Sequence, residues 1–375
     1  MRIKAAMLRE TGLPRPYAQS RPLEIVGLDL AGPGRGEVLV KIKAAGLCHS
    51  DLSVIDGSRL RPMPMVLGHE AAGIVEQLGE GVEDLAPGDH VVLVFMPSCG
   101  RCLPCATGRP ALCEPGAKAN GAGTLLRGTR RLEFGCEPVS HHLGVSAFAE
   151  YAVVSQESCV RVDSSLPFDQ AALFGCAVLT GVGAVVNTAR VPPGSSVGIV
   201  GLGGVGLSAV LGAVISGARQ IVAVDLFYEK LAFARSLGAT HTVNAASASA
   251  VEEIKALSAG GVEYFFEMAG AVPALELAYA ATARGGTTVT AGLPHPSRML
   301  SLAAVSLVAE ERTLKGSYIG SCVPRRDLPR YVALFMDGRM PVDRLLTHRL
   351  ALEDINEGFD RLHDGTGVRQ VVILE

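Results

Sequence analysis

The chain has 375 residues, a formal net charge of −3 and nine cysteines, and this length is enough for two domains of ordinary size. The nearly balanced charge provides no basic field for nucleic acids or acidic membranes, and 44 glycines without a Gly-X-Y period exclude a collagen-like chain. Met1–Glu10 lacks the apolar core of a signal peptide, so we expect a cytoplasmic protein.

Short strands separated by turns are the pattern of residues 1–90. Glu37–Ala44 alternates apolar and polar residues, Gly73–Leu78 is apolar, and a Pro-Gly-Asp turn precedes the apolar run His90–Phe95. This pattern predicts a mostly β domain with little helix.

Potential metal ligands occur in two turns of this domain, each just beyond a strand. One turn is Gly46–Asp51, which contains Cys48, and the other is Gly68-His69-Glu70. Further along, Cys176 lies in a helical stretch that begins at Pro167. In isolation, Cys176 is best interpreted as a small buried residue.

Four of the cysteines form a compact cluster with the spacing C-x2-C-x2-C-x7-C: Cys99, Cys102, Cys105 and Cys113. Thiolates at this spacing can surround one Zn²⁺ ion tetrahedrally, because glycine and proline turns bring the sulfurs back to one point. A [4Fe–4S] cluster and unliganded thiols are the alternatives. Four protein ligands leave no open position, so a zinc ion here would stabilise a lobe near residues 97–115 and perform no chemistry.

The segment from Pro115 to Leu143 is rich in glycine, arginine and polar residues and has no clear periodicity, so we interpret it as a long excursion. The next predicted strand is Phe148–Val154.

A dinucleotide-binding unit is predicted at Val197–Asp225, where an apolar strand ends in G-x-G-x-x-G and a second apolar strand ends in an acid. Gly201 permits the sharp turn, Gly203 allows close approach of a pyrophosphate, and Gly206 lets the following helix lie against the sheet. Asp225 would accept hydrogen bonds from the adenosine ribose and repel a 2′-phosphate, which favours NAD over NADP. A glycine-rich turn without a ligand is the alternative.

The same region contains no charged residue between Arg190 and Arg219, a stretch longer than the roughly 20 residues that span a bilayer. Five glycines within Gly198–Gly206 and a Pro-Pro-Gly turn argue against one continuous helix. A buried parallel strand followed by a buried helix has the same hydropathy, so we expect no membrane partner.

After Val191, apolar strands alternate with helical patterns, which predicts a doubly wound parallel sheet whose strand order the sequence does not reveal. The six predicted strands fall near 197–200, 221–225, 241–243, 263–267, 287–291 and 313–317. An amphipathic helix, Leu328–Met336, and a terminal V-V-I-L strand follow, and we expect them to return to the first domain.

In chain order, these motifs resemble the zinc-containing medium-chain alcohol dehydrogenase family. The resemblance rests on Cys48, Gly68-His69-Glu70, the four-cysteine cluster, Cys176 and the Gly201–Asp225 unit, and it covers essentially the whole chain. It implies an α/β protein with a mostly β GroES-like catalytic domain, residues 1–178 and 320–375, around a Rossmann NAD-binding domain, residues 179–319. The active site of the family lies in the cleft between the two domains.

The resemblance also assigns a catalytic centre. Cys48, His69 and Cys176 would be the ligands of a catalytic zinc ion, which leaves a fourth position for water or a substrate oxygen. Asp51 would orient His69, and Glu70 would lie behind the metal, although solvated turn carboxylates are the alternative for both. Ser50 occupies the position that takes the hydroxyl proton. Ser53 stands where many members pass that proton to a histidine, so the exit of the relay is open.

Cofactor contacts follow in the same way. His49 and Arg369 match positions at the pyrophosphate, and Lys230 matches a residue at the adenosine ribose, with a surface charge as the alternative for each. A relay base is a further alternative for His49. Thr180 and Val205 match residues that pack on the nicotinamide.

The implied function is oxidation of primary alcohols, aromatic or longer-chain ones included, with hydride transfer to NAD and two zinc ions per subunit. Phe95, Leu293 and Tyr318 align with the substrate pocket, and Ser50 in place of threonine leaves space for a bulky alcohol. A glutathione-dependent formaldehyde dehydrogenase is the nearest alternative, although the basic residue that such enzymes have after the fourth structural cysteine is missing from Glu114–Ala117. A non-catalytic protein that binds NAD and zinc is the alternative from another class.

The Pro115–Leu143 segment resembles that of the longer, dimeric family members, which favours a homodimer. Cys136, Cys159 and Cys322 have no assigned partner and are interpreted as ordinary thiols.

Overall fold

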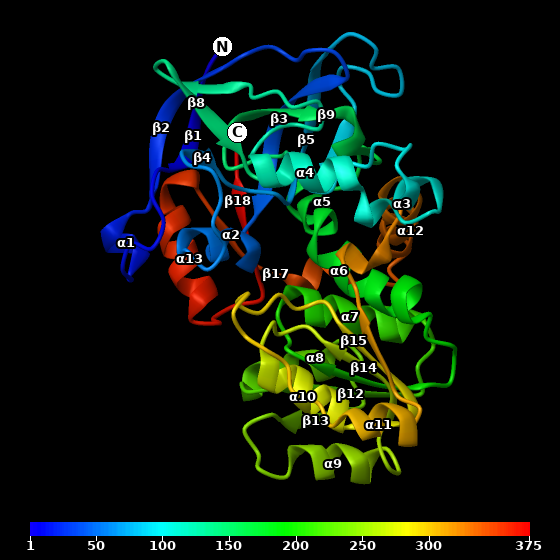
Figure 1. The fold of residues 1–375 in the computed structure, drawn as a ribbon. Helices are drawn as coiled ribbons and strands as arrows, with labels where there is room; N and C mark the ends of the chain where they lie inside the picture. Colours follow the sequence, from blue (N-terminus) through cyan, green and yellow to red (C-terminus); the bar gives the residue numbers. More distant parts are fainter. The chain divides into compact units, whose positions relative to one another are not determined.

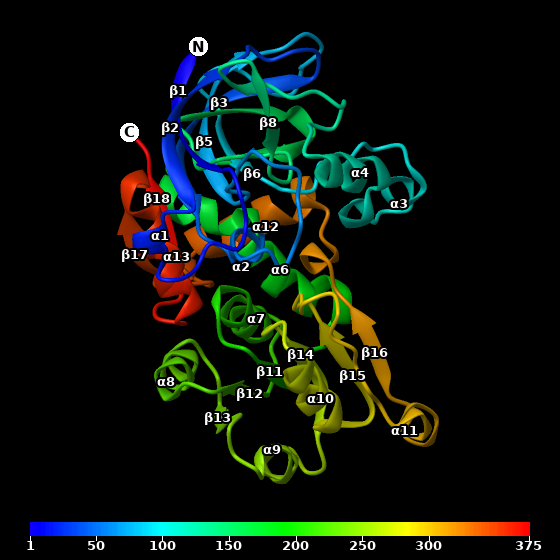
Figure 2. The same ribbon diagram turned by 60° about the vertical axis from the view of Figure 1, so that its left-hand side comes forward.

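The computed structural model describes residues 1–375, and the chain forms two compact units. The first comprises Met1–Cys176, Val323–Met336 and Val342–Glu375, and the second comprises Ala177–Cys322 and Asp337–Pro341. The first is mostly β, and the second is a parallel sheet with helices (Figures 1 and 2). This combination confirms the predicted fold class.

The first unit contains a closed barrel, whose strands in spatial order are β1 (Arg2–Leu8), β2 (Leu23–Leu30), β7 (Leu132–Phe134), β8 (Glu137–His141) and β4 (Met65–Val66). Its interior is an apolar cluster that includes Met7, Leu28 and Val139. Alternation along β1 directs Ile3, Ala5 and Met7 into this cluster, while Ala6 and Leu8 on the opposite face are buried as well.

The second sheet of this unit has seven strands. Six run in the order β10 (Cys159–Arg161), β6 (His90–Leu93), β5 (Ala71–Leu78), β3 (Glu37–Gly46), β18 (Arg369–Ile373) and β17 (Leu346–Leu350), and β9 (Tyr151–Ser155) also pairs with β3. The C-terminal β18 runs antiparallel to β3, with Val371 opposite Gly46 (Figure 1). This pairing places Arg369 on the strand next to the Cys48 turn.

The helices of the first unit range from four to thirteen residues. They are α1 (Tyr17–Ser20), α2 (His49–Ile55), α3 (Leu103–Ala106), α4 (Glu114–Ala122), α5 (Phe168–Ala171), α12 (Pro324–Met336) and α13 (Ile355–His363).

The second unit is a six-stranded parallel sheet with the order β13 (His241–Asn244), β12 (Gln220–Asp225), β11 (Ser196–Val200), β14 (Val262–Glu267), β15 (Thr282–Thr290) and β16 (Thr313–Gly316). Every residue of β11 and β12 is buried, because helices cover both faces of the sheet. The order reverses between β11 and β14, and in such sheets the ligand binds at this switch point. Figure 2 shows β13 and β16 at opposite edges.

The helices of this unit are α6 (Ala177–Gly183), continued by a π-helical turn (Ala184–Ala189), α7 (Gly204–Ile215), α8 (Tyr228–Ser236), α9 (Ala250–Leu257), α10 (Val272–Ala280) and α11 (Ala304–Ala309). Small residues allow close packing of α6 on α7: a side-chain carbon at Gly181 would collide with the backbone of Val205.

No single helix of the structure has both the length and the apolar composition needed to cross a membrane. Phe168–Gly175 and Ala177–Ala189 meet that test only when taken together as a bent pair.

The Pro115–Leu143 segment, interpreted from sequence as a long excursion without clear periodicity, contains regular structure. The segment contains most of α4 and the hairpin β7–β8, which supplies two strands of the barrel. Helix α4 reads E-P-G-A-K-A-N-G-A and has no apolar stripe, and β7 is only three residues long. Neither element carries enough periodicity to be recognised from sequence.

Candidate active site

The three side chains assigned to a catalytic zinc ion come together in the first unit. Cys48 directly precedes α2, His69 follows β4, and Cys176 follows the 3₁₀ turn Ala172–Gly175. The two sulfur atoms and the ligand nitrogen lie within 4.8 Å of one another, and all three residues are buried.

The donor set of this cluster fits zinc. The Nε2 atom of His69 is buried and has no hydrogen-bond partner in the protein. A hydrogen bond from Cys176 lowers the pKa of the Cys48 thiol well below its ordinary value despite burial. Two sulfurs and an unpartnered imidazole nitrogen are three ligands of a tetrahedral zinc site, and the fourth position stays open to an oxygen ligand.

Asp51 is completely buried and lies against the far side of the His69 ring. Its Oδ2 is 3.0 Å from His69 Nδ1, and its Oδ1 accepts a hydrogen bond of 2.9 Å from the Gly68 backbone N–H. Burial lowers the pKa of His69, but the charges of Asp51 and Cys48 outweigh burial and raise it well above its ordinary value. This carboxylate therefore fixes the orientation of the His69 ring, the arrangement found in carboxylate–histidine–zinc sites.

Glu70 and Arg369 form a buried ion pair next to the cluster, in which the Arg369 guanidinium donates to Glu70 Oε1. Burial raises the pKa of Glu70 to about 7, although the charge of Arg369 opposes this shift. The family resemblance matches Arg369 to a residue at the cofactor pyrophosphate, and in the structure the Arg369 guanidinium donates to Glu70.

The residues of the expected proton path lie on α2. The Ser50 hydroxyl is 3.9 Å from Cys48 Sγ, and Ser50 is half-buried, whereas His49 is exposed. The Ser53 hydroxyl donates a 2.8 Å hydrogen bond to the His49 carbonyl oxygen one turn earlier. The Ser53 hydroxyl is thus hydrogen-bonded to the backbone of its own helix, at the position where the resemblance would place a histidine in many family members.

His142 is part of this site but was not predicted. It directly follows β8, is buried, and its Nε2 lies 3.4 Å from Asp51 Oδ1. Its ring meets that of His69 edge to face, with centroids 5.6 Å apart. Burial lowers the pKa of His142 to about 3. The only signal in the sequence is the adjacent pair His141-His142, and no spacing relates this pair to the metal ligands.

Of the expected pocket residues, Phe95 lies beside the Cys48–His69–Cys176 group. Its ring packs edge to face on that of His69, with centroids 5.4 Å apart. Leu293 and Tyr318 belong to the second unit and are 53% and 36% exposed.

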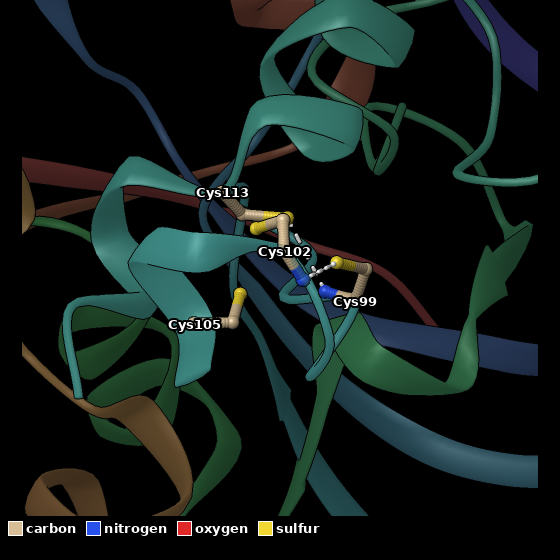
Figure 3. A group of neighbouring side chains, drawn as sticks. All are labelled: Cys99, Cys102, Cys105 and Cys113. Atoms are coloured by element: carbon tan, nitrogen blue, oxygen red, sulfur yellow. Dashed lines mark hydrogen bonds between the residues drawn. The ribbon is translucent and has the colours of Figure 1, made fainter. Parts of the chain in front are cut away.

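A second group of ligands is formed by the four-cysteine cluster, in which all four sulfur atoms lie within 4.8 Å of one another (Figure 3). Backbone N–H groups already point at the sulfurs: Cys113 Sγ accepts from Cys99 and Gly116, and Cys99 Sγ accepts from Cys102. Four sulfurs with hydrogen bonds from backbone amides fit a closed tetrahedral zinc site.

The glycine-rich loop of the second unit connects β11 to α7. Gly201 has a positive φ of 89°, and a side-chain carbon at Gly206 would collide with the Gly201 carbonyl oxygen, whereas Gly203 faces open space. The Asp225 carboxylate ends β12 and accepts hydrogen bonds from the backbone N–H groups of Leu202 and Phe227. Asp225 therefore holds the glycine-rich loop against the end of β12.

The remaining predicted cofactor residues also lie in the second unit. Thr180 is buried in α6, and Val205 is half-buried in the first turn of α7. The Lys230 ammonium lies 5.0 Å from the centroid of the Phe227 ring, so a cation–π contact holds it near the end of β12.

Two family models match the chain. The model described as alcohol dehydrogenase GroES-like domain covers residues 34–164, and the model described as zinc-binding dehydrogenase covers residues 204–337. Among curated proteins, an S-(hydroxymethyl)glutathione dehydrogenase from Paracoccus denitrificans is 37% identical over 383 residues, with all of both chains covered.

Solved structures give the same result. An alcohol dehydrogenase zinc-binding domain protein from Burkholderia ambifaria is 36% identical, with a TM-score of 0.94 and coverage of 100% of this chain and 99% of the other. A benzyl alcohol dehydrogenase from Acinetobacter calcoaceticus is 34% identical, with a TM-score of 0.93 and all of both chains covered. The chain belongs to the zinc-dependent medium-chain alcohol dehydrogenase family and is an oxidoreductase with a GroES-like and a Rossmann domain.

Proposed function

We propose that this enzyme oxidises primary alcohols, aromatic and longer-chain ones included, to aldehydes and transfers the hydride to NAD. The observation that carries the proposal is the buried cluster of Cys48, His69 and Cys176, whose three donor atoms leave one position open for a substrate oxygen. A zinc ion held there supplies Lewis-acid polarisation of the alcohol oxygen.

The protein residues around the cluster would orient the ligands and remove the proton. Asp51 fixes the His69 ring through Nδ1, which leaves the unpartnered Nε2 as the ligand atom for the group with the two sulfurs. Ser50, whose hydroxyl is close to Cys48, is the residue that we assign to accept the hydroxyl proton of the alcohol. The Ser53 hydroxyl is bonded to the helix backbone and does not replace the histidine that passes the proton on in many family members. The proton must therefore continue from Ser50 by another route.

We assign NAD to the loop after β11, with the pyrophosphate over Gly203 and the N-terminus of α7. Gly203 faces open space, which supports close approach by a phosphate. Both Asp225 oxygens already accept one backbone hydrogen bond, and each keeps a second lone pair for a ribose hydroxyl. The negative charge at this position disfavours the 2′-phosphate of NADP.

Two arguments support an aromatic or bulky substrate. The Phe95 ring packs at right angles against the His69 ring beside the Cys48–His69–Cys176 group, and Ser50 occupies less space than the threonine that can stand at this position. The relative from A. calcoaceticus is named for benzyl alcohol. Aromatic rings prefer edge-to-face and offset packing, which Phe95 can offer to a benzyl group.

Oxidation of formaldehyde as its glutathione adduct is the second candidate, and it is favoured by the name of the P. denitrificans relative. Such enzymes have a basic residue just after the fourth structural cysteine. In this chain the corresponding residues are Glu114-Pro115-Gly116-Ala117, the start of α4, and none of them is basic. We therefore rank this activity second.

Initial rates measured with NAD and NADP over a panel of substrates test this ranking. The panel contains ethanol, longer alkanols, benzyl alcohols and formaldehyde with and without glutathione. We expect the highest kcat/KM for a bulky primary alcohol with NAD. A strict requirement for glutathione would reverse the ranking.

We further propose that the four-cysteine cluster holds a second, structural zinc ion and that the enzyme works in a reducing compartment such as the cytoplasm. Six of the nine cysteines belong to the two ligand groups, and thiolate ligands persist where disulfides do not form.

We also propose a homodimer. Strand β16 is an edge of the parallel sheet, and the nearby residues Met299, Val305 and Val308 are exposed apolar side chains. An exposed strand edge bordered by apolar residues pairs readily with a second chain. Sedimentation velocity should give the mass of two chains, and a monomer at micromolar concentration would refute this part of the proposal.

A further inference from the structure

We propose that His142 is a positioning residue of the zinc site: it donates a hydrogen bond to Asp51 and thereby holds the carboxylate that orients His69. This inference rests on the proposed function, because it assigns His142 to the catalytic zinc ligand. The three groups form a row in which His142 Nε2 is 3.4 Å from Asp51 Oδ1 and Asp51 Oδ2 is 3.0 Å from His69 Nδ1.

The chemistry of the row favours one direction for the hydrogen bond. A neutral imidazole carries one N–H, on either Nδ1 or Nε2. Both ring nitrogens of His142 are buried and make no hydrogen bond within the standard geometric limits, but Nε2 lies 3.4 Å from the Asp51 Oδ1 carboxylate oxygen. A proton on Nε2 therefore has an acceptor, and a proton on Nδ1 has none.

Asp51 needs such a donor because it is completely buried. Its Oδ1 accepts one hydrogen bond, from the Gly68 N–H, and its Oδ2 faces His69. Burying a carboxylate with few hydrogen-bond donors costs free energy, and little then fixes the rotation of the carboxylate group. A second donor on the Oδ1 side would keep Oδ2 directed at His69.

The backbone around His142 is built to hold the ring in place. The His142 N–H donates to Ser146 Oγ at 2.9 Å, and Ser146 Oγ donates to the Val66 carbonyl oxygen at 2.8 Å. Leu143 and Ser146 have φ values of 50° and 56°, a conformation that non-glycine residues adopt at a cost. Val66, which accepts the hydrogen bond from Ser146, is the last residue of β4, and the His69 turn follows this strand directly. Strand β4 therefore positions both His142 and His69.

A role in packing alone and a role in positioning lead to different results for two substitutions. His142→Phe keeps an aromatic ring edge-on to His69 but removes the nitrogen that faces Asp51. His142→Gln loses the ring and keeps an amide N–H that reaches about as far as Nε2. If His142 acts by packing alone, the phenylalanine variant should keep more activity than the glutamine variant. If it positions Asp51, the glutamine variant should keep more.

The experiment measures zinc affinity by competition with a chromogenic chelator, together with kcat and the KM for NAD. We expect His142→Phe to lower the zinc affinity of the Cys48–His69–Cys176 site and kcat by about tenfold. The KM for NAD and the zinc affinity of the four-cysteine site should stay as in the wild type. His142→Gln should keep most of the wild-type zinc affinity and kcat.

His141→Phe is the matched control. This neighbouring histidine is equally buried, but its Nε2 accepts a hydrogen bond from the Arg131 N–H and does not face Asp51. It should lower the thermal stability without changing the zinc affinity of the catalytic site.

Two results would overturn the inference. Unchanged zinc affinity and kcat in His142→Phe would show that the ring only fills space, as would a glutamine variant no better than the phenylalanine variant. If the wild type itself binds no zinc at Cys48, His69 and Cys176, the proposed function fails together with this inference. A wild type that binds zinc there, with an unaffected His142→Phe, removes the inference alone.

Discussion

Arg369 and Glu70, 299 positions apart in the chain, form a buried ion pair beside Cys48 and His69. The C-terminal strand β18 brings Arg369 to this place by pairing with β3, directly before the Cys48 turn. The last residues of the chain thereby contribute to the electrostatics of the candidate zinc site.

The first prediction is that Arg369→Leu lowers the free energy of unfolding by about 3–5 kcal/mol, because it leaves Glu70 buried without its partner. Denaturant unfolding measures this loss. Arg2→Leu is the control: Arg2 pairs with Asp29 at 3.6 Å, but its side chain is 70% exposed, so stability should hardly change. Equal losses in the two variants would mean that the buried pair has no special weight.

The second prediction concerns pH and His141. Burial lowers the pKa of His141 to about 4 from an ordinary value of 6.5. Between these values the unfolded chain binds a proton that the folded protein does not, so stability is lost as the pH falls from 6.5 towards 4. The full effect is about 3 kcal/mol.

The variant His141→Gln should therefore show a shallower decline of unfolding free energy between about pH 6.5 and 4. Glutamine keeps an acceptor for the Arg131 N–H. The exposed His295, replaced by Asn, is the control and should leave the decline as in the wild type. An unchanged decline in His141→Gln would refute the assignment.

The third prediction is a change of cofactor preference in Asp225→Asn. The amide keeps an acceptor for one of the two backbone N–H groups but removes the negative charge. The ratio of kcat/KM for NAD to that for NADP should fall by about tenfold, the equivalent of one charged hydrogen bond. A ratio equal to that of the wild type would remove Asp225 from ribose recognition.

The fourth prediction is that Cys102→Ser releases the proposed structural zinc and lowers the melting temperature. The catalytic site uses different ligands, so zinc bound by Cys48, His69 and Cys176 should remain. Cys136→Ser, which replaces an exposed thiol outside both ligand groups, is the control and should keep both the metal and the melting temperature. Full zinc content in Cys102→Ser would argue against the four-cysteine site.

The sequence was sufficient to predict features that depend on local spacing. The C-x2-C-x2-C-x7-C run and the β11–α7 glycine loop are each contained in a short segment, so their residue types determine their geometry. The six parallel strands were also recognisable, because burial on both faces produces continuous apolar runs. Strand β15 begins at Thr282, several residues before the predicted start near residue 287. The first part of the strand contains polar residues and Gly285, so it has no apolar run that would identify it.

Features that depend on distant parts of the chain were out of reach. The strand order, the Arg369–Glu70 pair and the approach of His142 to Asp51 arise from tertiary packing between segments without a shared motif. The assignment of Cys176 as a ligand came only from family resemblance and stays a prediction, because a lone cysteine in an apolar segment has no distinguishing pattern.

The most direct test of the central claim is the zinc content per chain, measured with alcohol-dependent NAD reduction, in the wild type and in Cys176→Ala. We predict two zinc ions and turnover of a primary alcohol in the wild type. In Cys176→Ala we predict one zinc ion, retained by the four-cysteine cluster, and no turnover. Two zinc ions without turnover of any alcohol in the wild type, or turnover that persists in Cys176→Ala, would contradict the account.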